Sequence, residues 1–282
     1  TMIIIADSGS TKTNWIISEG GKVVKKIHTD GLNPNFASRE RIIGVLENDL
    51  LPEIEKSERA RIYFYGSGCS GTYACKKMKE SFEAVFINAN IEINSDLLGA
   101  ARALLGPTKG IACILGTGSN SCLYDGRHII HNIPPLGFIL GDEGSGAYLG
   151  KRLISDYLKG IMPHDVSELF AAGFDADKEE VIQKVYRGEF PNKYIASFVV
   201  FLKENISNKY CNGLLRDSFS DFIGRNIKHY DKYDKMEISF TGSIAWYFSE
   251  ILEDVMSSFR LKTGRIIREP SERIMEYHLR EG

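Results

Sequence analysis

Apolar residues form short runs along the chain, and these alternate with stretches of helical spacing. The runs near residues 2–5, 15–17, 22–28, 61–66, 91–93, 110–115, 121–124 and 237–240 predict strands, because they are short and bounded by Gly, Ser, Asp or Asn. Spacings of three and four residues predict helices at about 38–51, 72–82, 97–105, 147–158, 244–259 and 271–278. Strands that alternate with helices are typical of an α/β fold.

The same pattern occurs twice at the beginning of an apolar segment. The first strand leads into Asp7 and a Gly/Ser/Thr turn at 8–13, and a second strand follows. After the break at Gly106-Pro107, the run 110–115 leads into a similar turn at 116–120, again followed by a strand. This weak repeat predicts two modules that face each other across a cleft and hold the two ends of a polyphosphate. Residues 166–230 are mostly helical in pattern, and the sequence assigns them no role.

Composition narrows the class of protein. The 282 residues are 43% hydrophobic and 26% charged, with a net charge of -2, which is ordinary for a globular protein of two domains. The charge balance argues against a nucleic-acid partner. We find no apolar run long enough to span a membrane and no secretory signal. The five cysteines contain no C-x-x-C pair, which favours free thiols in the cytoplasm.

Two groups of residues suggest phosphate chemistry. The turn 8–13 offers hydroxyls and backbone N–H groups that can cradle a phosphate, and Asp7 can hold Mg²⁺ directly or through water. An ordinary β-hairpin explains the same residues equally well. Asp96 follows a short strand at the start of a helix, and there the residues alone favour a helix N-cap over a general base. The sequence has no G-x-x-x-x-G-K-[ST] motif, so it is not a P-loop enzyme.

Four stretches together carry a family resemblance: 7–13, 114–120, 141–146 and 240–244. With these stretches in this order, the chain resembles the N-acetylglucosamine kinase and BadF/BadG/BcrA/BcrD ATPase family, within the actin-like, sugar kinase and Hsp70 group. Ser8 departs from the family pattern, which usually has glycine there. The resemblance implies an α/β fold of two ribonuclease-H-like (actin-like ATPase) domains around a central cleft. The expected domains are 1–107 with 270–282, and 108–269 with a helical insert.

The resemblance also implies the cofactors and their ligands. ATP and Mg²⁺ are expected, with Asp7 and Glu143 near the metal. The residues expected to contact ATP are Gly9, Ser10, Thr11, Lys12, Thr13, Gly116, Thr117, Gly118, Gly242 and Ser243. Lys12 is equally well explained as a solvated lysine in a turn. A homodimer is expected from the family alone.

For the reaction, the resemblance implies that Asp96 is the general base that takes the proton of a sugar hydroxyl. The expected sugar ligands are Asn35, Ser70, Gly71, Asn120, Gly137 and Asp142, with Asn33 as an alternative to Asn35. The leading hypothesis is ATP-dependent phosphorylation of an amino sugar, first of all N-acetylglucosamine to its 6-phosphate. Glucosamine, N-acetylmannosamine and N-acetylmuramic acid are alternative substrates. An ATPase activator of a radical dehydratase or reductase is the alternative function, and a sugar-responsive regulator would need an added DNA-binding module.

Overall fold

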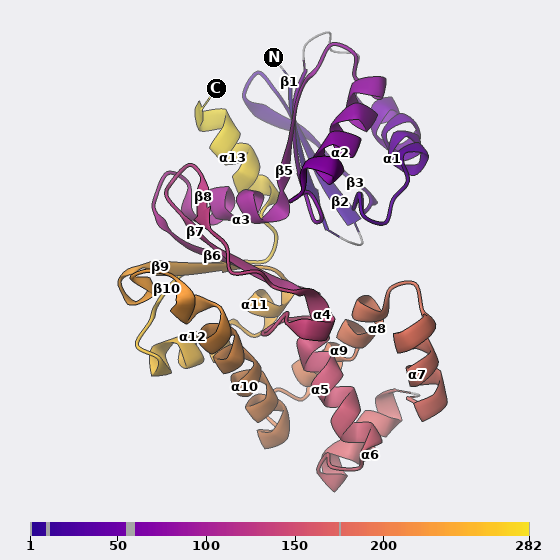
Figure 1. Cartoon of the computed structure of the whole chain (residues 1–282), viewed down its shortest axis with the longest axis vertical. Helices are drawn as coiled ribbons and strands as arrows, with labels where there is room; N and C mark the ends of the chain where they lie inside the picture. Colours follow the sequence, from indigo (N-terminus) through magenta and orange to yellow (C-terminus); the bar gives the residue numbers. More distant parts are fainter. Residues whose placement is uncertain (1, 10–11, 55–59, 175, 282) are drawn as a thin grey trace. The chain divides into compact units, whose positions relative to one another are not determined.

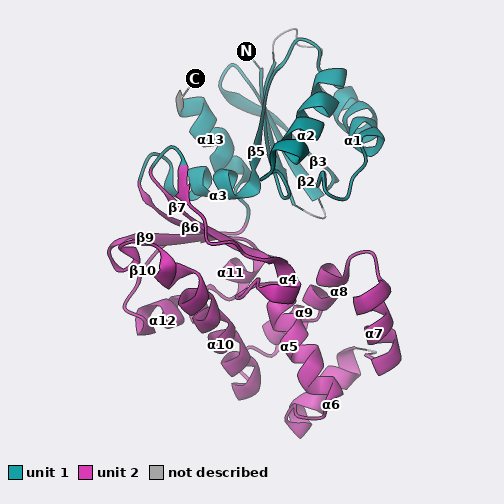
Figure 2. Ribbon diagram, in the orientation of Figure 1, with its two compact units in different colours: residues 1–108, 126–128, 269–282 teal, residues 109–125, 129–268 magenta. Residues whose placement is uncertain are grey.

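The chain forms two compact units (Figure 2). The computed structural model describes residues 2–9, 12–54, 60–174 and 176–281. Unit 1 comprises residues 1–108, 126–128 and 269–282, and unit 2 comprises residues 109–125 and 129–268. We propose that these units are the two domains expected from the sequence.

Unit 1 is built on a five-stranded mixed sheet (Figure 1). Its strands are β1 (Met2–Ser8), β2 (Lys12–Glu19), β3 (Lys22–Asp30), β4 (Ala60–Gly66) and β5 (Asn90–Ser95), in the order β3-β2-β1-β4-β5. The first three strands form an antiparallel meander, and β4 and β5 continue the sheet in parallel with β1. Ser8 pairs with Gly66 and Gly66 with Ser95, so three strand ends meet at one edge of this sheet.

Helices cover both faces of this sheet. They are α1 (Arg39–Val45), which continues into the short helical turns η1 (Leu46–Leu50) and η2 (Leu51–Glu53), then α2 (Thr72–Val85), α3 (Asp96–Leu105) and α13 (Ser271–Glu281). Phe64 of β4 packs edge-on against Phe82 of α2, whereas its neighbours Tyr63 and Tyr65 contact His278 of α13. Because successive side chains of a strand point to opposite faces, α2 and α13 lie on opposite sides of the sheet. Burial on both faces explains the nearly continuous apolar run in β1.

Unit 2 repeats this topology. Its strands are β6 (Gly110–Leu115), β7 (Ser119–Tyr124), β8 (Ile129–His131), β9 (Glu237–Thr241) and β10 (Lys262–Ile267), in the order β10-β9-β6-β7-β8. Again three antiparallel strands are followed by two that run parallel to the first. The internal repeat expected from the two strand-turn-strand patterns is therefore confirmed, and it extends over the whole sheet. Strand β10 was not expected from the sequence.

The helices of unit 2 are α4 (Gly137–Leu140), α5 (Gly146–Leu158), α6 (His164–Gly173), α7 (Lys178–Arg187), α8 (Pro191–Ser197), α9 (Val199–Glu204), α10 (Lys209–Arg225), α11 (Ser243–Tyr247) and α12 (Ser249–Ser258), with short turns η3 (Ile227–His229) and η4 (Tyr233–Lys235). Phe170 of α6 is fully buried and packs against the rings of Phe174, Phe198 and Phe201. These rings share one core cluster with residues of β6 and β9, so the helical region 166–230 is part of unit 2. None of the described helices is both long and apolar enough to cross a membrane.

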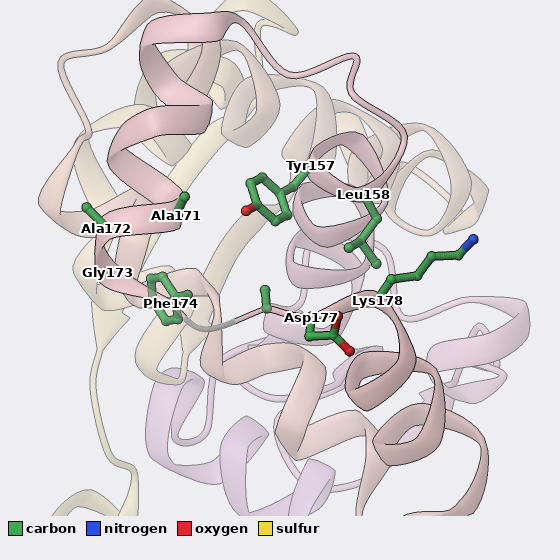
Figure 3. Close-up of a pocket in the computed structure, with 9 residues that line it drawn as sticks. Tyr157, Leu158, Ala171, Ala172, Gly173, Phe174, Asp177 and Lys178 are labelled. Carbon is green, nitrogen blue, oxygen red and sulfur yellow. The ribbon is translucent and has the colours of Figure 1, made fainter.

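A cavity of about 730 Å³ lies in this helical region, between the ends of α5 and α6 and the start of α7 (Figure 3). Its lining residues are Tyr157, Leu158, Ala171, Ala172, Gly173, Phe174, Ala176, Asp177 and Lys178. None of these residues belongs to the site predicted from the sequence.

Candidate active site

The turn between β1 and β2 is held together by buried hydroxyl groups. Ser8 Oγ lies 2.8 Å from Thr13 Oγ1 and accepts a hydrogen bond of 2.9 Å from the N–H of Leu32. The Thr13 hydroxyl also donates to the carbonyl of Asp30 at 3.0 Å. Ser8 therefore replaces the usual family glycine without needing a positive φ. The Thr13 side chain is fully buried and stabilises the turn. A contact of Thr13 with ATP stays a prediction.

The remaining residues of this turn lie closer to solvent. Gly9 is exposed, and its N–H donates to the carbonyl of Lys12 at 3.0 Å, which closes the hairpin. Gly9 does not adopt a positive φ. The predicted ATP contacts Ser10 and Thr11 lie outside the described residues.

Asp7 lies near the end of β1 in a poorly solvated position. Burial raises the pKa of its carboxyl from 3.8 to about 7, and the negative charges of Asp96 and Glu269 add to this effect. A hydrogen bond from Asn14 and the charge of Lys12 act in the opposite direction. Because the ionised form of Asp7 is unfavourable in this position, a bound cation would stabilise it. The carboxylate oxygen atoms are the hard ligands that Mg²⁺ prefers.

Lys12, at the start of β2, forms an ion pair with Glu269, and its Nζ lies 2.8 Å from Oε1. Asn14 Nδ2 donates to the other Glu269 oxygen at 3.5 Å, and Asn14 Oδ1 lies 2.8 Å from His28 Nδ1. The pair is half exposed, so it stabilises the fold only weakly and Lys12 can exchange Glu269 for a phosphate. Sequence reasoning missed Glu269 and Asn14. The only signal for Asn14 was a polar residue at the head of an apolar run.

Asp96 is the first residue of α3, but it is not the N-cap. That position belongs to Ser95, whose hydroxyl accepts a hydrogen bond of 3.2 Å from the N–H of Leu98. Asp96 Oδ1 accepts a bond of 2.8 Å from the N–H of Leu97. Burial raises the pKa of Asp96 to about 6, against the lowering effect of its backbone hydrogen bonds. The capping role is thus already filled, and a carboxylate that titrates near 6 can accept a proton.

The loop after β3 contacts the turn after β4. Asn33 is buried, and its Oδ1 accepts a hydrogen bond of 2.9 Å from the N–H of Asn35. A Cβ built on Gly68 would lie 2.4 Å from Asn33 Oδ1 and 2.8 Å from Asn35 Nδ2, so both amides pack on this glycine. Asn33 holds the loop together and Asn35 is exposed, and the choice between them as sugar ligand stays a prediction. Ser70 and Gly71, which follow Gly68 in the chain, are exposed just before α2.

In unit 2, the turn between β6 and β7 is fixed to the start of α5. The N–H of Gly116 donates to the carbonyl of Gly118 at 2.9 Å, which closes the turn. The N–H groups of Gly146 and Ala147 donate to the carbonyls of Gly116 and Thr117 at 2.8 and 2.9 Å. The predicted ATP residues Gly116, Thr117 and Gly118 are therefore held as one turn against the start of α5, whose first N–H groups are used by this turn and by Ser145.

Gly242, the predicted adenosine contact, lies against this same turn. It has a φ of 115°, and a Cβ built on it would lie 2.3 Å from the carbonyl oxygen of Leu115. The lack of a side chain at Gly242 is thus required by the backbone of β6, whether or not adenine binds there. Ser243 follows as the exposed first residue of α11. The structure therefore brings Gly242 and Gly116 together at the ends of β9 and β6.

Asp142 also contacts the β6–β7 turn. Its backbone has a φ of 59°, and a Cβ built on Gly118 would lie 2.9 Å from its Oδ2. Burial raises the pKa of its carboxyl to about 6, partly offset by a hydrogen bond from the N–H of Ser119. The nearby charge of Glu143 raises this pKa further, and that of Lys151 lowers it. Asp142 is therefore a hydrogen-bond acceptor above pH 6, which suits a sugar hydroxyl.

Glu143, predicted near the metal, already has two partners. Its Oε1 lies 2.6 Å from Arg225 Nε, and Asn226 Nδ2 donates to its Oε2 at 3.4 Å. The side chain is buried, so this pair offsets the cost of removing its charge from water. A metal role for Glu143 stays a prediction. Among the described residues, no cluster of three or more His, Cys, Asp or Glu side chains is placed to bind a metal ion, although Mg²⁺ commonly uses only one or two protein carboxylates.

Asn120 and Gly137 complete the predicted sugar ligands. Asn120 is half-buried at the start of β7, and its Oδ1 accepts hydrogen bonds from the N–H of Ser121 and from Asn132 Nδ2, each at 2.9 Å. Gly137 is exposed, with a φ of 73°, at the start of α4. Asn120 and Asp142 are connected through the adjacent residue Ser119. The role of Gly137 as a sugar ligand stays a prediction.

The comparison with known proteins decides the family. No family model and no curated protein matches the chain. Among solved structures, a protein described as a "putative N-acetylglucosamine kinase" from Porphyromonas gingivalis is 40% identical, covers 99% of each chain, and superposes with a TM-score of 0.93. This chain belongs to the N-acetylglucosamine kinase family. The family expected from the four loops is therefore confirmed.

More distant structures support the fold of this family member. A second protein described as a "putative N-acetylglucosamine kinase", from Chromobacterium violaceum, is 18% identical over 98% of each chain, with a TM-score of 0.77. The ethanolamine utilization protein EutJ from Carboxydothermus hydrogenoformans is 14% identical and covers 99% of this chain and 89% of its own, with a TM-score of 0.52. At these identities the likeness concerns the fold alone. It confirms the expected actin-like α/β fold with two ribonuclease-H-like units.

The cysteines bear on the alternative function of a dehydratase activator, in which cysteines hold an iron–sulfur cluster between two subunits. All five lie in the described part of the chain as free thiols, four buried and Cys75 half-buried. Burial raises the pKa of the Cys69 thiol to about 12, so the thiolate that binds metal is strongly disfavoured. No observation favours the activator function.

Proposed function

We propose that this protein is an ATP-dependent sugar kinase, with an amino sugar as acceptor and N-acetylglucosamine, phosphorylated at its 6-hydroxyl, as the first candidate. One observation carries the proposal beyond family membership. Asp96 is a half-buried carboxylate in the first turn of α3, its pKa is raised to about 6 by loss of solvation, and Ser95 fills the capping role. Such a group is suited to general-base catalysis near neutral pH.

In the proposed reaction, the sugar hydroxyl oxygen attacks the γ-phosphorus of ATP while its proton passes to Asp96. The bond from the γ-phosphorus to the bridging oxygen breaks, and ADP leaves with that oxygen. Asp142 and Asn120 would orient the sugar. The Asp142 carboxylate is itself positioned by a hydrogen bond from the N–H of Ser119. The fixed turn at 116–118 and the side chain of Lys12 would contact the phosphates. Mg²⁺, for which the Asp7 carboxylate is suited, would neutralise phosphate charge when bound.

The test is a coupled ADP-release assay with Mg-ATP and four sugars: N-acetylglucosamine, glucosamine, N-acetylmannosamine and N-acetylmuramic acid. We expect turnover with one of these sugars and a fall in kcat of about 10²- to 10⁴-fold in Asp96→Asn, because the base is lost while the side-chain shape is kept. Asp165→Asn is the matched control, since Asp165 is an exposed acid in the first turn of α6. The control should keep the wild-type rate.

Two results would contradict the proposal. Sugar-independent ATP hydrolysis, or no ADP release with any sugar, would refute the kinase function. Full turnover by Asp96→Asn would be compatible with the kinase function but would refute the role of Asp96 as its general base. A wild-type rate that falls on acidification with an apparent pKa near 6 would agree with the environment of Asp96, although Asp7 and Asp142 titrate in the same range.

A further inference from the structure

The amide of Asn120 is fixed in one orientation by its neighbours. Its Oδ1 accepts two hydrogen bonds of 2.9 Å, one from the backbone N–H of Ser121 and one from Nδ2 of Asn132. An amide oxygen has two lone pairs, so these bonds use its acceptor capacity fully. The Asn120 Nδ2 group makes no further hydrogen bond with the described residues. The free end of this side chain is therefore the donor end.

Asn132 directly follows β8 and is hydrogen-bonded to the neighbouring strand β7. Its Nδ2 group lies 2.7 Å from the carbonyl oxygen of Ser121 and 3.2 Å from the carbonyl oxygen of Ile133, the next residue in the chain. The hydroxyl of the buried Tyr230 accepts a bond of 3.0 Å from the N–H of Ile133 and lies 2.8 Å from Ser121 Oγ. Segment 131–133 is thus attached at two points to the strand that carries Asn120.

We propose that Asn132 is a positioning residue that turns the NH₂ group of Asn120 toward the substrate, so that Asn120 recognises a hydrogen-bond acceptor. This inference rests on the proposed sugar-kinase function. Asp142 is the complementary partner, because its carboxylate accepts hydrogen bonds. The pair selects a sugar that offers a hydroxyl hydrogen to Asp142 and an oxygen lone pair, from a hydroxyl or an acyl carbonyl, to Asn120.

Two variants of Asn132 and one control test this assignment. Asn132→Asp places a carboxylate opposite Asn120 Oδ1, which repels that oxygen and favours the reversed amide. Asn132→Leu removes the donor without adding a charge. Tyr230→Phe loosens the same segment by deleting the hydroxyl that binds Ile133 and Ser121, but it leaves the contact between the two amides intact.

The kinetic measurement uses whichever sugar the wild-type protein turns over. We expect KM for that sugar to rise about tenfold in Asn132→Asp and about threefold in Asn132→Leu, with kcat changed less than twofold, because a ground-state hydrogen bond is lost. Tyr230→Phe should stay within twofold of the wild type in both constants. Unchanged KM in both Asn132 variants, or an equal rise in Tyr230→Phe, would overturn the assignment.

A second measurement needs no turnover, so it separates this inference from the proposed function. In the free protein, the side-chain NH₂ protons of Asn132 should exchange with solvent more slowly than those of Asn120, as followed by NMR. In Asn132→Asp the Asn120 NH₂ protons should become protected, since they now donate to the new carboxylate. Fast exchange at Asn132 in the wild type would refute the orientation. Protection as expected without turnover of any sugar would refute the kinase function alone.

Discussion

Asp7 should destabilise the folded protein at neutral pH when no cation is bound. Its pKa is raised from 3.8 to about 7, first by burial and then by the charges of Asp96 and Glu269. Replacing Asp7 with Asn keeps the shape of the side chain and removes the ionisation. We therefore expect Asp7→Asn to be more stable than the wild type at pH 8 in the presence of a chelator.

The size of this destabilisation, and the pH range over which it develops, follow from the pKa values of Asp7 in the unfolded and folded states. At about 1.4 kcal/mol per pH unit, a difference of about 3 units corresponds to about 4 kcal/mol as an upper limit. At pH 4 the Asp7 carboxyl is protonated in the folded protein and about half ionised in the unfolded chain, so its ionisation costs less than about 1 kcal/mol. Between pH 4 and 7 the unfolded chain ionises while the folded protein keeps its proton, so the free energy of unfolding falls with rising pH. Above pH 7 the loss is constant.

The two tryptophans allow this to be measured in unit 1 alone. Trp15 is fully buried in β2, and Trp246 is exposed in unit 2. In a Trp246→Phe background, the fluorescence of Trp15 reports the unfolding of unit 1 by urea. The free energy of unfolding would be compared with and without the Asp7→Asn substitution in this background at pH 4, 6 and 8, with EDTA present.

We expect the Asp7→Asn form to gain about 2 to 4 kcal/mol at pH 8 and less than about 1 kcal/mol at pH 4. An equal difference at both pH values would refute the reasoning, because an ionisation effect must follow pH. Adding Mg²⁺ should stabilise the wild type and not Asp7→Asn if the carboxylate holds the metal. Equal stabilisation of both forms would refute Asp7 as a ligand.

Two further predictions concern stability. Burial lowers the pKa of His278 to about 4, so the free energy of unfolding of His278→Gln relative to that of the wild type should rise by up to about 3 kcal/mol as pH falls from 6.5 to 4 in the Trp15 assay. Gly242→Ala should destabilise unit 2 by about 3 kcal/mol, since its φ is 115° and a Cβ would meet the Leu115 carbonyl at 2.3 Å. The control is Gly213→Ala in α10, where a Cβ meets nothing within 4 Å. This substitution should stabilise the protein by about 0.5 to 1 kcal/mol. Equal effects of the two alanines in urea unfolding would contradict the steric argument.

The sequence was most informative where burial on both faces produces continuous apolar runs. Strands β1 and β6 lie at the centres of their sheets. The run 110–115 predicts β6 to the residue, and the run 2–5 predicts the first half of β1. Strand β10 was missed because it is a half-buried edge strand with Gly264 in its middle and a register irregularity between Thr263 and Ile266. Edge strands bury less, so their pattern is weaker.

The candidate site was predictable where a residue's role follows from its place at a strand end. Asp7 and Asp96 were placed in this way, as was the turn 116–118. The ion pair of Lys12 with Glu269 joins residues 257 positions apart, and no local pattern can reveal it. For the same reason the partners of Glu143 were missed. Asp142 and Glu143 were predicted as a pair of acids, but one contacts the β6–β7 turn and the other binds Arg225.

The position of α13 in unit 1 has a consequence for biosynthesis. Its buried residues Ile274, Met275 and His278 pack with α3, β1, β2 and β4. A ribosome therefore delivers the five strands of this unit long before the helix that covers one of their faces. Because domains generally fold as units during synthesis, unit 2 can complete its core first, and unit 1 remains open until α13 emerges and docks. Until the end of translation, the nascent chain therefore carries this apolar sheet face covered by α3 alone, and such exposed apolar surface favours aggregation.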